Sequence, residues 1–223
     1  MTQKFTILFD LDGTLVNTAP DLMNAHNHVM KKYGFKEKNL SDIKKLAGRG
    51  SKVMLTRSLS SVANSNEFED KIDDMTNEFI NYYSNNISNE STLKKGLLNF
   101  LSWCKEKSIR LAVCTNKKEY LSIDLLKKIK IYHFFEYVAG GDTFKHNKPD
   151  PKHLTDTIEI IGGSVKKTIM IGDSETDSNA SKAANIPFVL IDDGYTEKKS
   201  NEIFHDHLVK DYVGLEKIIE KYL

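Results

Sequence analysis

The strongest constraint on the fold is a repeated pattern in which a short apolar segment ends abruptly at polar residues. It occurs at residues 4–9, 109–114, 168–171 and 186–191, and each segment contains β-branched residues. Helical patterns occupy residues 97–107, 118–130, 151–161 and 175–184, so strand and helix candidates alternate. Such alternation is typical of βαβ units, whose strands pair in parallel. We therefore predict an α/β fold.

A weaker strand candidate at residues 137–139 brings the predicted sheet to five strands or more, in a Rossmann-like arrangement flanked by helices. In open parallel sheets the carboxyl ends of the strands lie at one edge, and ligands bind there. Polar residues follow the four main segments, in the order Asp10-Leu-Asp-Gly, Thr115-Asn, Gly172-Asp and Asp192-Asp-Gly. We expect these residues to converge at that edge.

The interval from residue 16 to residue 91 departs from this rhythm. It contains no convincing strand, and its helical patterns lie near residues 17–33, 41–46, 52–62 and 68–83. An all-helical insert after the first strand explains the interruption, because it can cover the edge of the sheet where ligands bind. We predict a discontinuous core domain of residues 1–15 and 92–223 and a helical cap domain of residues 16–91.

Composition excludes several classes of protein. The 223 residues have a formal net charge of +1, which disfavours nucleic acid and anionic membranes as partners. Two cysteines are too few for a disulfide framework, and both are expected to be buried thiols. No apolar stretch approaches the length of a membrane helix or a signal peptide, so we expect a cytoplasmic protein without membrane partners. We expect it to be a monomer or a homodimer.

Two acidic pairs are the main chemical signal. Asp10 and Asp12 follow the first strand, and Asp173 and Asp177 lie where the strand at 168–171 gives way to a helix. Taken singly, each is also explained by ordinary turn chemistry or by helix capping. Together, at one sheet edge, their oxygen atoms predict a Mg²⁺ site. We expect Asp177 to project one turn into the helix.

Two further polar positions suit a phosphate group. Thr115 and Asn116 end a strand and offer a hydroxyl and backbone N–H groups to phosphoryl oxygens, although capping of the next helix is the alternative interpretation. Lys148 lies between Asn147 and Pro149, and Pro149 and Pro151 give its segment a stiff backbone. A lysine among 29 is usually a solvated surface residue, so only its neighbours make Lys148 a candidate.

The order of these motifs along the chain resembles that of a known protein family. Phe9-Asp-Leu-Asp-Gly-Thr-Leu15, Thr115, Lys148 and Asp173 with Asp177 are similar to the four motifs of the haloacid dehalogenase-like hydrolases that carry a helical cap after the first strand. The resemblance covers essentially the whole chain. Residues 16–22, 115–117 and 148–151 look most like phosphoglycolate phosphatases, although Asn17 stands where such sequences often have an acid.

The resemblance implies a reaction and a set of roles. Asp10 would be the nucleophile that forms an aspartyl phosphate, and Asp12 would be the general acid and base. Lys148 would neutralise charge, and Mg²⁺ would be held by Asp10, the Asp12 carbonyl and Asp173. Asp177 would act behind them on the metal waters or on Lys148. The implied phosphate-binding residues are Gly13, Thr115, Asn116 and Lys148.

The expected substrate is a small phosphorylated metabolite, with 2-phosphoglycolate the best single guess. Arg49, in Gly48-Arg49-Gly50, is a candidate clamp for a substrate carboxylate, and solvent exposure is the equally plausible alternative. Enzymatic alternatives are a sugar phosphomutase similar to β-phosphoglucomutase, a pyrophosphatase or a nucleotidase.

Two alternatives come from outside the enzymes. A signalling receiver domain has its acidic pair before the phosphorylated aspartate, which is the reverse of the order in this chain. A catalytically silent binding module with this fold stays open as an alternative. His205 and His207 are expected to lie in a polar surface loop.

Overall fold

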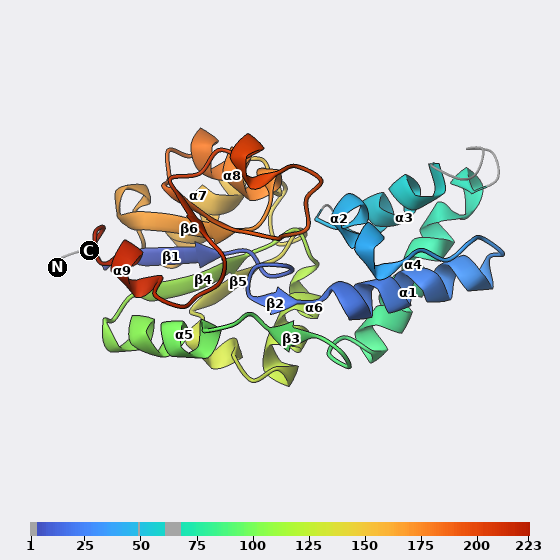
Figure 1. The fold of residues 1–223 in the computed structure, drawn as a ribbon, viewed down its shortest axis with the longest axis horizontal. Helices are drawn as coiled ribbons and strands as arrows, with labels where there is room; N and C mark the ends of the chain where they lie inside the picture. Colours follow the sequence, from blue (N-terminus) through green and yellow to red (C-terminus); the bar gives the residue numbers. More distant parts are fainter. Residues whose placement is uncertain (1–3, 49, 61–67) are drawn as a thin grey trace.

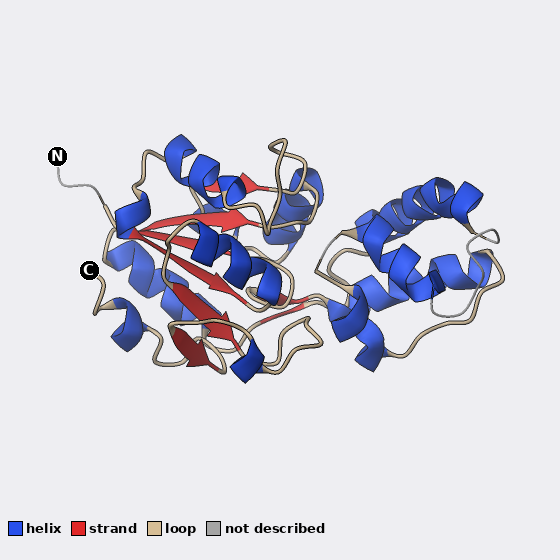
Figure 2. Ribbon diagram, turned by 90° about the horizontal axis from the view of Figure 1, so that it is seen from above, coloured by secondary structure: helices blue, strands red, loops and turns tan. Residues whose placement is uncertain are grey.

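The computed structural model describes residues 4–48, 50–60 and 68–223. These residues form a sheet flanked by helices and a separate group of helices, joined by a narrow two-stranded ribbon (Figures 1 and 2). We refer to these groups as the sheet part and the helical part. None of the helices within the described residues is long and apolar enough to cross a bilayer.

The described residues form one six-stranded parallel sheet in the order β5-β4-β1-β6-β7-β8, which confirms the predicted α/β fold. β1 lies in the middle of the sheet, and its last residue, Phe9, pairs in register with Val113 and Ile171 (Figure 1). The carboxyl ends of the three central strands are therefore level. The strands are β1 (Thr6–Phe9), β4 (Arg110–Cys114), β5 (Tyr137–Ala139), β6 (Thr168–Gly172), β7 (Phe188–Ile191) and β8 (His207–Val209).

Helices cover both faces of the sheet. Successive side chains of β1 point to opposite faces and pack against the helices on each side. Phe9 packs edge-on against Phe100 and Phe135 on one face. Leu8 belongs to a second buried cluster with Leu154 and Ala180 on the other face. The helices of this part are α5 (Leu97–Glu106), α6 (Glu119–Lys128), α7 (Lys152–Ile160), α8 (Glu175–Ala183) and α9 (Glu216–Ile219).

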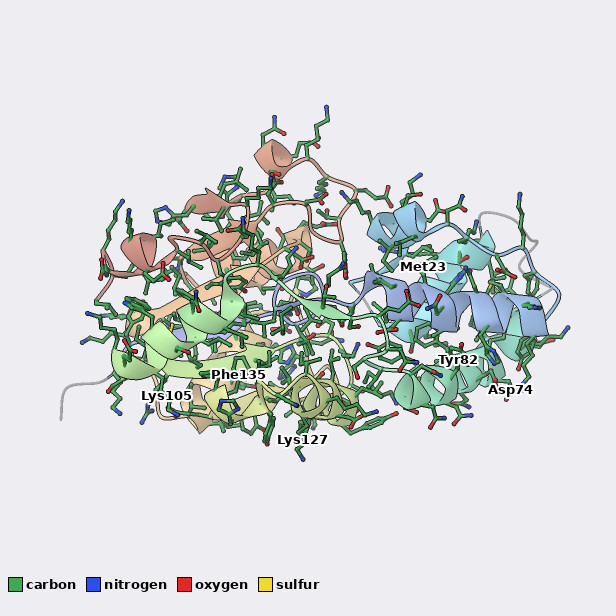
Figure 3. All side chains as sticks on the ribbon, turned by 60° about the horizontal axis from the view of Figure 1, so that its bottom comes forward. Met23, Asp74, Tyr82, Lys105, Lys127 and Phe135 are labelled. Carbon is green, nitrogen blue, oxygen red and sulfur yellow. The ribbon has the colours of Figure 1, made fainter. Side chains whose placement is uncertain are left out.

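The helical part is built around the pairing of α1 with α4. Its helices are α1 (Ala19–Lys32), α2 (Ile43–Leu46), α3 (Ser51–Ser60) and α4 (Ile72–Asn85). Met23 and Phe79 are buried between these helices, whereas Tyr82 stacks on His28 with ring centroids 4.1 Å apart. Figure 3 shows Met23 on α1 and Tyr82 and Asp74 on α4, far from Phe135 in the sheet part.

Two expectations about strands are wrong. The interval 16–91 does contain a strand, because β2 (Val16–Asn17) pairs antiparallel with β3 (Thr92–Leu93). Two-residue strands are too short to show a period in the sequence. His207 does not lie in a loop, because it begins β8 and pairs with Val189 of β7. Its strand lies at the edge of the sheet, where only part of each side chain is covered, so the strand lacks the continuous burial of the central strands.

The ribbon marks the two places where the chain passes between the two parts (Figure 2). This supports the division into a core of residues 1–15 and 92–223 and a cap of residues 16–91, and the division stays a proposal.

Several helix ends differ from the sequence estimate. The predicted helix at 68–83 begins as an α-helix only at Ile72, and the helix expected at 52–62 is described as far as Ser60.

Candidate active site

The candidate site lies at the carboxyl ends of β1, β4 and β6. The backbone pairing continues one residue past the strands, since Asp10 N–H donates to the Ile171 carbonyl at 3.0 Å and Thr115 N–H to the Ala139 carbonyl at 2.9 Å. The sheet therefore places Asp10 and Thr115 rigidly, and Asp173 follows β6 directly. Asp10, Thr115 and Asp173 are all buried. The predicted convergence of these three strand ends is observed.

Lys148 is buried between two carboxylates. Its Nζ atom lies 2.7 Å from Asp10 Oδ1 and 2.6 Å from Asp177 Oδ1, and its side chain is 2% exposed. Burial disfavours the charged ammonium, but the attraction of Asp10 and Asp177 is larger and raises the pKa of Lys148. Lys148 therefore stays protonated and fixes the position of the Asp10 carboxylate.

Asp177 lies in the first turn of α8 and has both oxygens occupied. Oδ2 accepts hydrogen bonds from Ser174 Oγ at 2.8 Å and from Ser174 N–H at 3.2 Å, which completes a capping box at the start of the helix. Oδ1 faces Lys148. A Cβ atom on Gly172 would lie 2.5 Å from Asp177 Cγ, so only glycine leaves room for this carboxylate. The contact fits the predicted role of Asp177 in orienting Lys148, and the role itself stays a prediction.

Asp173 is held from two sides. Thr14 Oγ1 donates to Asp173 Oδ1 at 3.2 Å, and the Tyr195 N–H donates to Oδ2 at 2.7 Å. Gly13 has φ +86°, and a Cβ atom there would lie 2.1 Å from Asp173 Oδ2. The observed contact of Gly13 is thus with Asp173, and its predicted contact with phosphate is untested.

The carboxylates of Asp10, Asp173 and Asp177 form a buried cluster whose ligand atoms lie within 4.8 Å of one another. Burial raises the pKa of Asp10 to about 6, with Lys148 opposing the shift, and burial together with Asp10 raises the pKa of Asp173. Three carboxylates and the single ammonium of Lys148 leave two uncompensated formal negative charges. Hard oxygen ligands with this charge deficit fit a divalent cation such as Mg²⁺.

Asp12 faces a different set of groups from Asp10. Thr18 Oγ1 donates to Asp12 Oδ1 at 2.7 Å, and Lys117 Nζ lies 3.1 and 3.2 Å from the two Asp12 oxygens. Lys117 Nζ also donates to the Tyr83 hydroxyl at 2.7 Å. Lys117 and Tyr83 are site residues that sequence reasoning missed. Lys117 could have been found from the sequence because it lies two residues after Thr115. Tyr83 has no such signal, since its sequence pattern is that of any aromatic residue on a helix.

The predicted phosphate-binding pair Thr115 and Asn116 lies beside this group. Thr115 Oγ1 accepts a hydrogen bond from Lys117 N–H at 3.3 Å. Asn116 Nδ2 donates to the Lys148 carbonyl at 2.8 Å and to the Gly48 carbonyl at 3.4 Å. The Asn116 side chain therefore ties down the segment that carries Lys148, which is a contact the sequence did not indicate. Binding of phosphate by either residue is untested.

These residues line a cavity of about 400 Å³ between the two parts of the molecule. Asp10, Asp173 and Lys148 lie on its sheet side, and Phe79 and Ile80 of α4 lie on its helical side. Arg49, the predicted carboxylate clamp, lies outside the described residues, and its neighbours Gly48 and Gly50 line the cavity. The cavity has a charged floor and a largely apolar roof.

Comparison with known proteins identifies the family. The model of the haloacid dehalogenase-like hydrolases matches residues 7–191, which include Asp10, Asp12, Lys148 and Asp173. The chain belongs to the haloacid dehalogenase-like hydrolase family. This confirms the resemblance drawn from the sequence motifs.

Relatives within this hydrolase family match almost the whole chain. A phosphoglycolate phosphatase of Agrobacterium fabrum is 36% identical over 219 residues, 96% of this chain and 94% of the relative. One of Mesorhizobium japonicum is 36% identical over 196 residues, 88% of this chain and 86% of the relative. The crystal structure of a predicted phosphoglycolate phosphatase from Haemophilus somnus superposes with a TM-score of 0.91 at 29% identity, covering 98% and 99% of the two chains.

Proposed function

We propose that this haloacid dehalogenase-like hydrolase is a Mg²⁺-dependent phosphatase that hydrolyses a small phosphate monoester through Asp10. The observation that carries the proposal is the buried Asp10 carboxylate, held 2.7 Å from Lys148 Nζ at the floor of a cavity. A carboxylate fixed in one orientation, with a cation beside it, is suited to attack an anionic phosphorus centre.

The chain's own residues supply the two chemical steps. An oxygen of Asp10 forms a bond to phosphorus while the bond from phosphorus to the bridging ester oxygen breaks, and Asp12 gives a proton to that oxygen. Asp12 then takes a proton from a water molecule whose oxygen attacks phosphorus and releases Asp10. Thr18 and Lys117 contact the Asp12 carboxylate and fix its position for both transfers. Thr115 and the adjacent backbone N–H groups are the candidates for the phosphoryl oxygens.

The acidic cluster is the proposed place of the metal. Asp10, the Asp12 carbonyl and Asp173 would hold Mg²⁺, and Asp177, which contacts Lys148, stands behind them. When bound, Mg²⁺ supplies positive charge that offsets the repulsion between the carboxylate and the phosphate. The charge deficit of the cluster supports this assignment.

The proposed substrate is 2-phosphoglycolate. The support is the name shared by relatives that are 36% and 34% identical over 96% and 95% of the chain, together with the lysine-containing Thr115-Asn-Lys segment at the cavity. A sugar phosphomutase uses the same first step but returns the phosphoryl group to a sugar. The cytoplasmic location and the monomer or homodimer predicted from the sequence stay predictions.

Phosphate release tests the proposal. We expect purified protein with Mg²⁺ to release phosphate from 2-phosphoglycolate faster than from glucose 1-phosphate, a nucleoside monophosphate or pyrophosphate. Asp10→Asn is expected to lower kcat by about three orders of magnitude or more, and EDTA to abolish release until Mg²⁺ is restored. An isomerised sugar phosphate without net phosphate release would instead indicate the mutase. Equal rates for wild type and Asp10→Asn would contradict the mechanism.

A further inference from the structure

We propose that Lys117 and Tyr83 form the subsite for the carboxylate of the substrate, an inference that rests on the proposed function. Lys117 is contributed by the segment between β4 and α6, and Tyr83 by α4 of the helical part. The subsite is therefore completed only when both parts of the molecule are in contact.

Lys117 has the position that such a role requires. Its side chain is 6% exposed, and its Nζ atom lies 3.1 Å from Asp12 Oδ1. If Asp12 protonates the bridging oxygen of the ester, the Lys117 ammonium, which contacts the same carboxylate, lies within reach of the atoms bonded to that oxygen. In 2-phosphoglycolate the bridging oxygen is joined through one CH₂ group to the carboxylate. This link is short enough for the carboxylate to reach the ammonium of Lys117 while Asp12 contacts the bridging oxygen.

Tyr83 adds a second donor at the same place. Its hydroxyl accepts a hydrogen bond from Lys117 Nζ at 2.7 Å, and the ammonium lies 4.2 Å from the centre of the Tyr83 ring. The hydroxyl proton remains to donate to a carboxylate oxygen. An ammonium and a phenol hydroxyl side by side can bind the two oxygens of one carboxylate, with charge-assisted strength in a buried setting.

Other described cations at the cavity fit this role less well. Lys148 is paired with two carboxylates, Asp10 and Asp177, whereas Lys117 is paired with one, Asp12. Lys52 is paired with Asp73 at 2.6 Å and its side chain is 57% exposed. The Lys118 side chain is exposed. Among the described residues that line the cavity, Lys117 is the buried cation that faces both Asp12 and the helical part.

The test compares two esters that differ in the carboxylate. Ethyl phosphate has a methyl group where 2-phosphoglycolate has the carboxylate, so the ratio of the two kcat/KM values measures recognition of the carboxylate. We expect Lys117→Met to lower this ratio at least about tenfold, the loss of one charge-assisted hydrogen bond, and Tyr83→Phe to lower it less. Lys117→Arg keeps the charge and is expected to retain more of the ratio than Lys117→Met.

A purely structural role of Lys117 would slow both esters equally and leave the ratio unchanged. Lys127→Met is the matched control, because Lys127 is an exposed residue of α6 that does not line the cavity, and its Nζ atom lies over the ring of Tyr132. A wild-type ratio preserved in Lys117→Met and in Tyr83→Phe would overturn the subsite and leave the phosphatase proposal standing. A wild-type enzyme with no preference for 2-phosphoglycolate over ethyl phosphate would overturn both the substrate and the subsite.

Discussion

At the scale of single residues, the acidic cluster is short of positive charge, and this governs its affinity for a cation. Asp173 contributes one carboxylate, fixed by Thr14 and by the backbone of Tyr195. We expect Asp173→Asn to weaken Mg²⁺ binding at least about tenfold, because it removes one charge while keeping the shape of the side chain. Isothermal titration of the wild type and the variant with Mg²⁺ measures this. Asp192→Asn, beyond β7 and outside the cluster, is the control and is expected to bind like the wild type.

His153 gives the folded protein a specific sensitivity to acid. Burial, and then the charge of Lys148, lowers the pKa of His153 from 6.5 to about 4. Between these pH values the unfolded chain binds a proton that the folded chain does not, so stability falls as pH falls from 6.5 to 4 and is retained above 6.5. The loss from this one group is about 3 kcal/mol when complete. Burial of Asp10 and Asp173 raises the pKa of both carboxyls and acts in the opposite direction over this pH range, so the contribution of His153 is measured by comparison with a variant that lacks the imidazole.

The variant His153→Asn isolates this contribution. Asn places an acceptor near the position of His153 Nδ1, which accepts the Lys148 N–H at 3.2 Å, but it does not titrate. We expect the free energy of unfolding of the wild type, measured in urea relative to that of the variant, to fall as pH falls from 6.5 to 4.5. Parallel profiles would mean that the imidazole is protonated as easily in the folded chain as in the unfolded one.

Residue type and position in the sequence were enough to predict which side chains lie near Asp10. They were not enough to predict every contact that these side chains make. Asp10, Lys148 and Asp173 were candidates because each follows a strand or a stiff turn, and they are brought together. Lys117 was missed because its chemistry depends on Asp12 and on Tyr83, which lie 105 and 34 residues away. A contact fixed by tertiary packing leaves no local pattern, particularly for one lysine among 29.

At the scale of elements, the ribbon of β2 and β3 is only two residue pairs long, so contacts with other segments are needed to stabilise it. The Tyr195 hydroxyl supplies it, accepting the Ala19 N–H at 2.8 Å and donating to Asn17 Oδ1 at 2.9 Å. It thereby joins the loop after β7 to the start of α1. Asn17, which departs from the family pattern, is used in this contact.

Replacement of Tyr195 by phenylalanine tests that link. Tyr195→Phe leaves the Ala19 N–H without its partner in a buried position, and we expect a loss of about 1–2 kcal/mol in the free energy of unfolding. Tyr120→Phe, at an exposed tyrosine of α6, is expected to change it by less than about 0.5 kcal/mol. Chemical denaturation of both variants measures the difference. Equal stability of the two would show that the link contributes nothing.

Long periodic elements were predictable, and short or edge elements were not. The central strands carry continuous apolar patterns because both faces of the sheet are buried, and α5, α6 and α7 each bury apolar residues at helical spacing. β2 and β3 are two residues each, so their pairing is visible only in three dimensions. β8 exposes Leu208 and half-buries His207 and Val209, which gives a mixed pattern that resembles a polar loop.

At the scale of the whole molecule, the chemistry and the recognition of substrate are divided between the two parts. The acidic cluster and Lys148 belong entirely to the sheet part, whereas Phe79, Ile80 and Tyr83 of α4 close the cavity from the other side. The backbone crosses between the two parts at the ribbon, once in β2 and once in β3. The sheet part should therefore fold and bind the metal without the helical part, but it should lose selectivity.

A shortened chain tests this division. In β2 and β3, Asn17 pairs with Thr92 in antiparallel register, so an Asn-Gly turn can join them in place of residues 18–91. We expect this chain to unfold cooperatively and to bind Mg²⁺, because β1 and both buried clusters of the sheet remain. Its ratio of kcat/KM for 2-phosphoglycolate over ethyl phosphate should approach one, because Tyr83 is lost and Lys117 is open to water. Circular dichroism, Mg²⁺ titration and phosphate release measure these outcomes. A chain that does not fold would show that the helical part belongs to the core, and an undiminished ratio would place recognition in the sheet part alone.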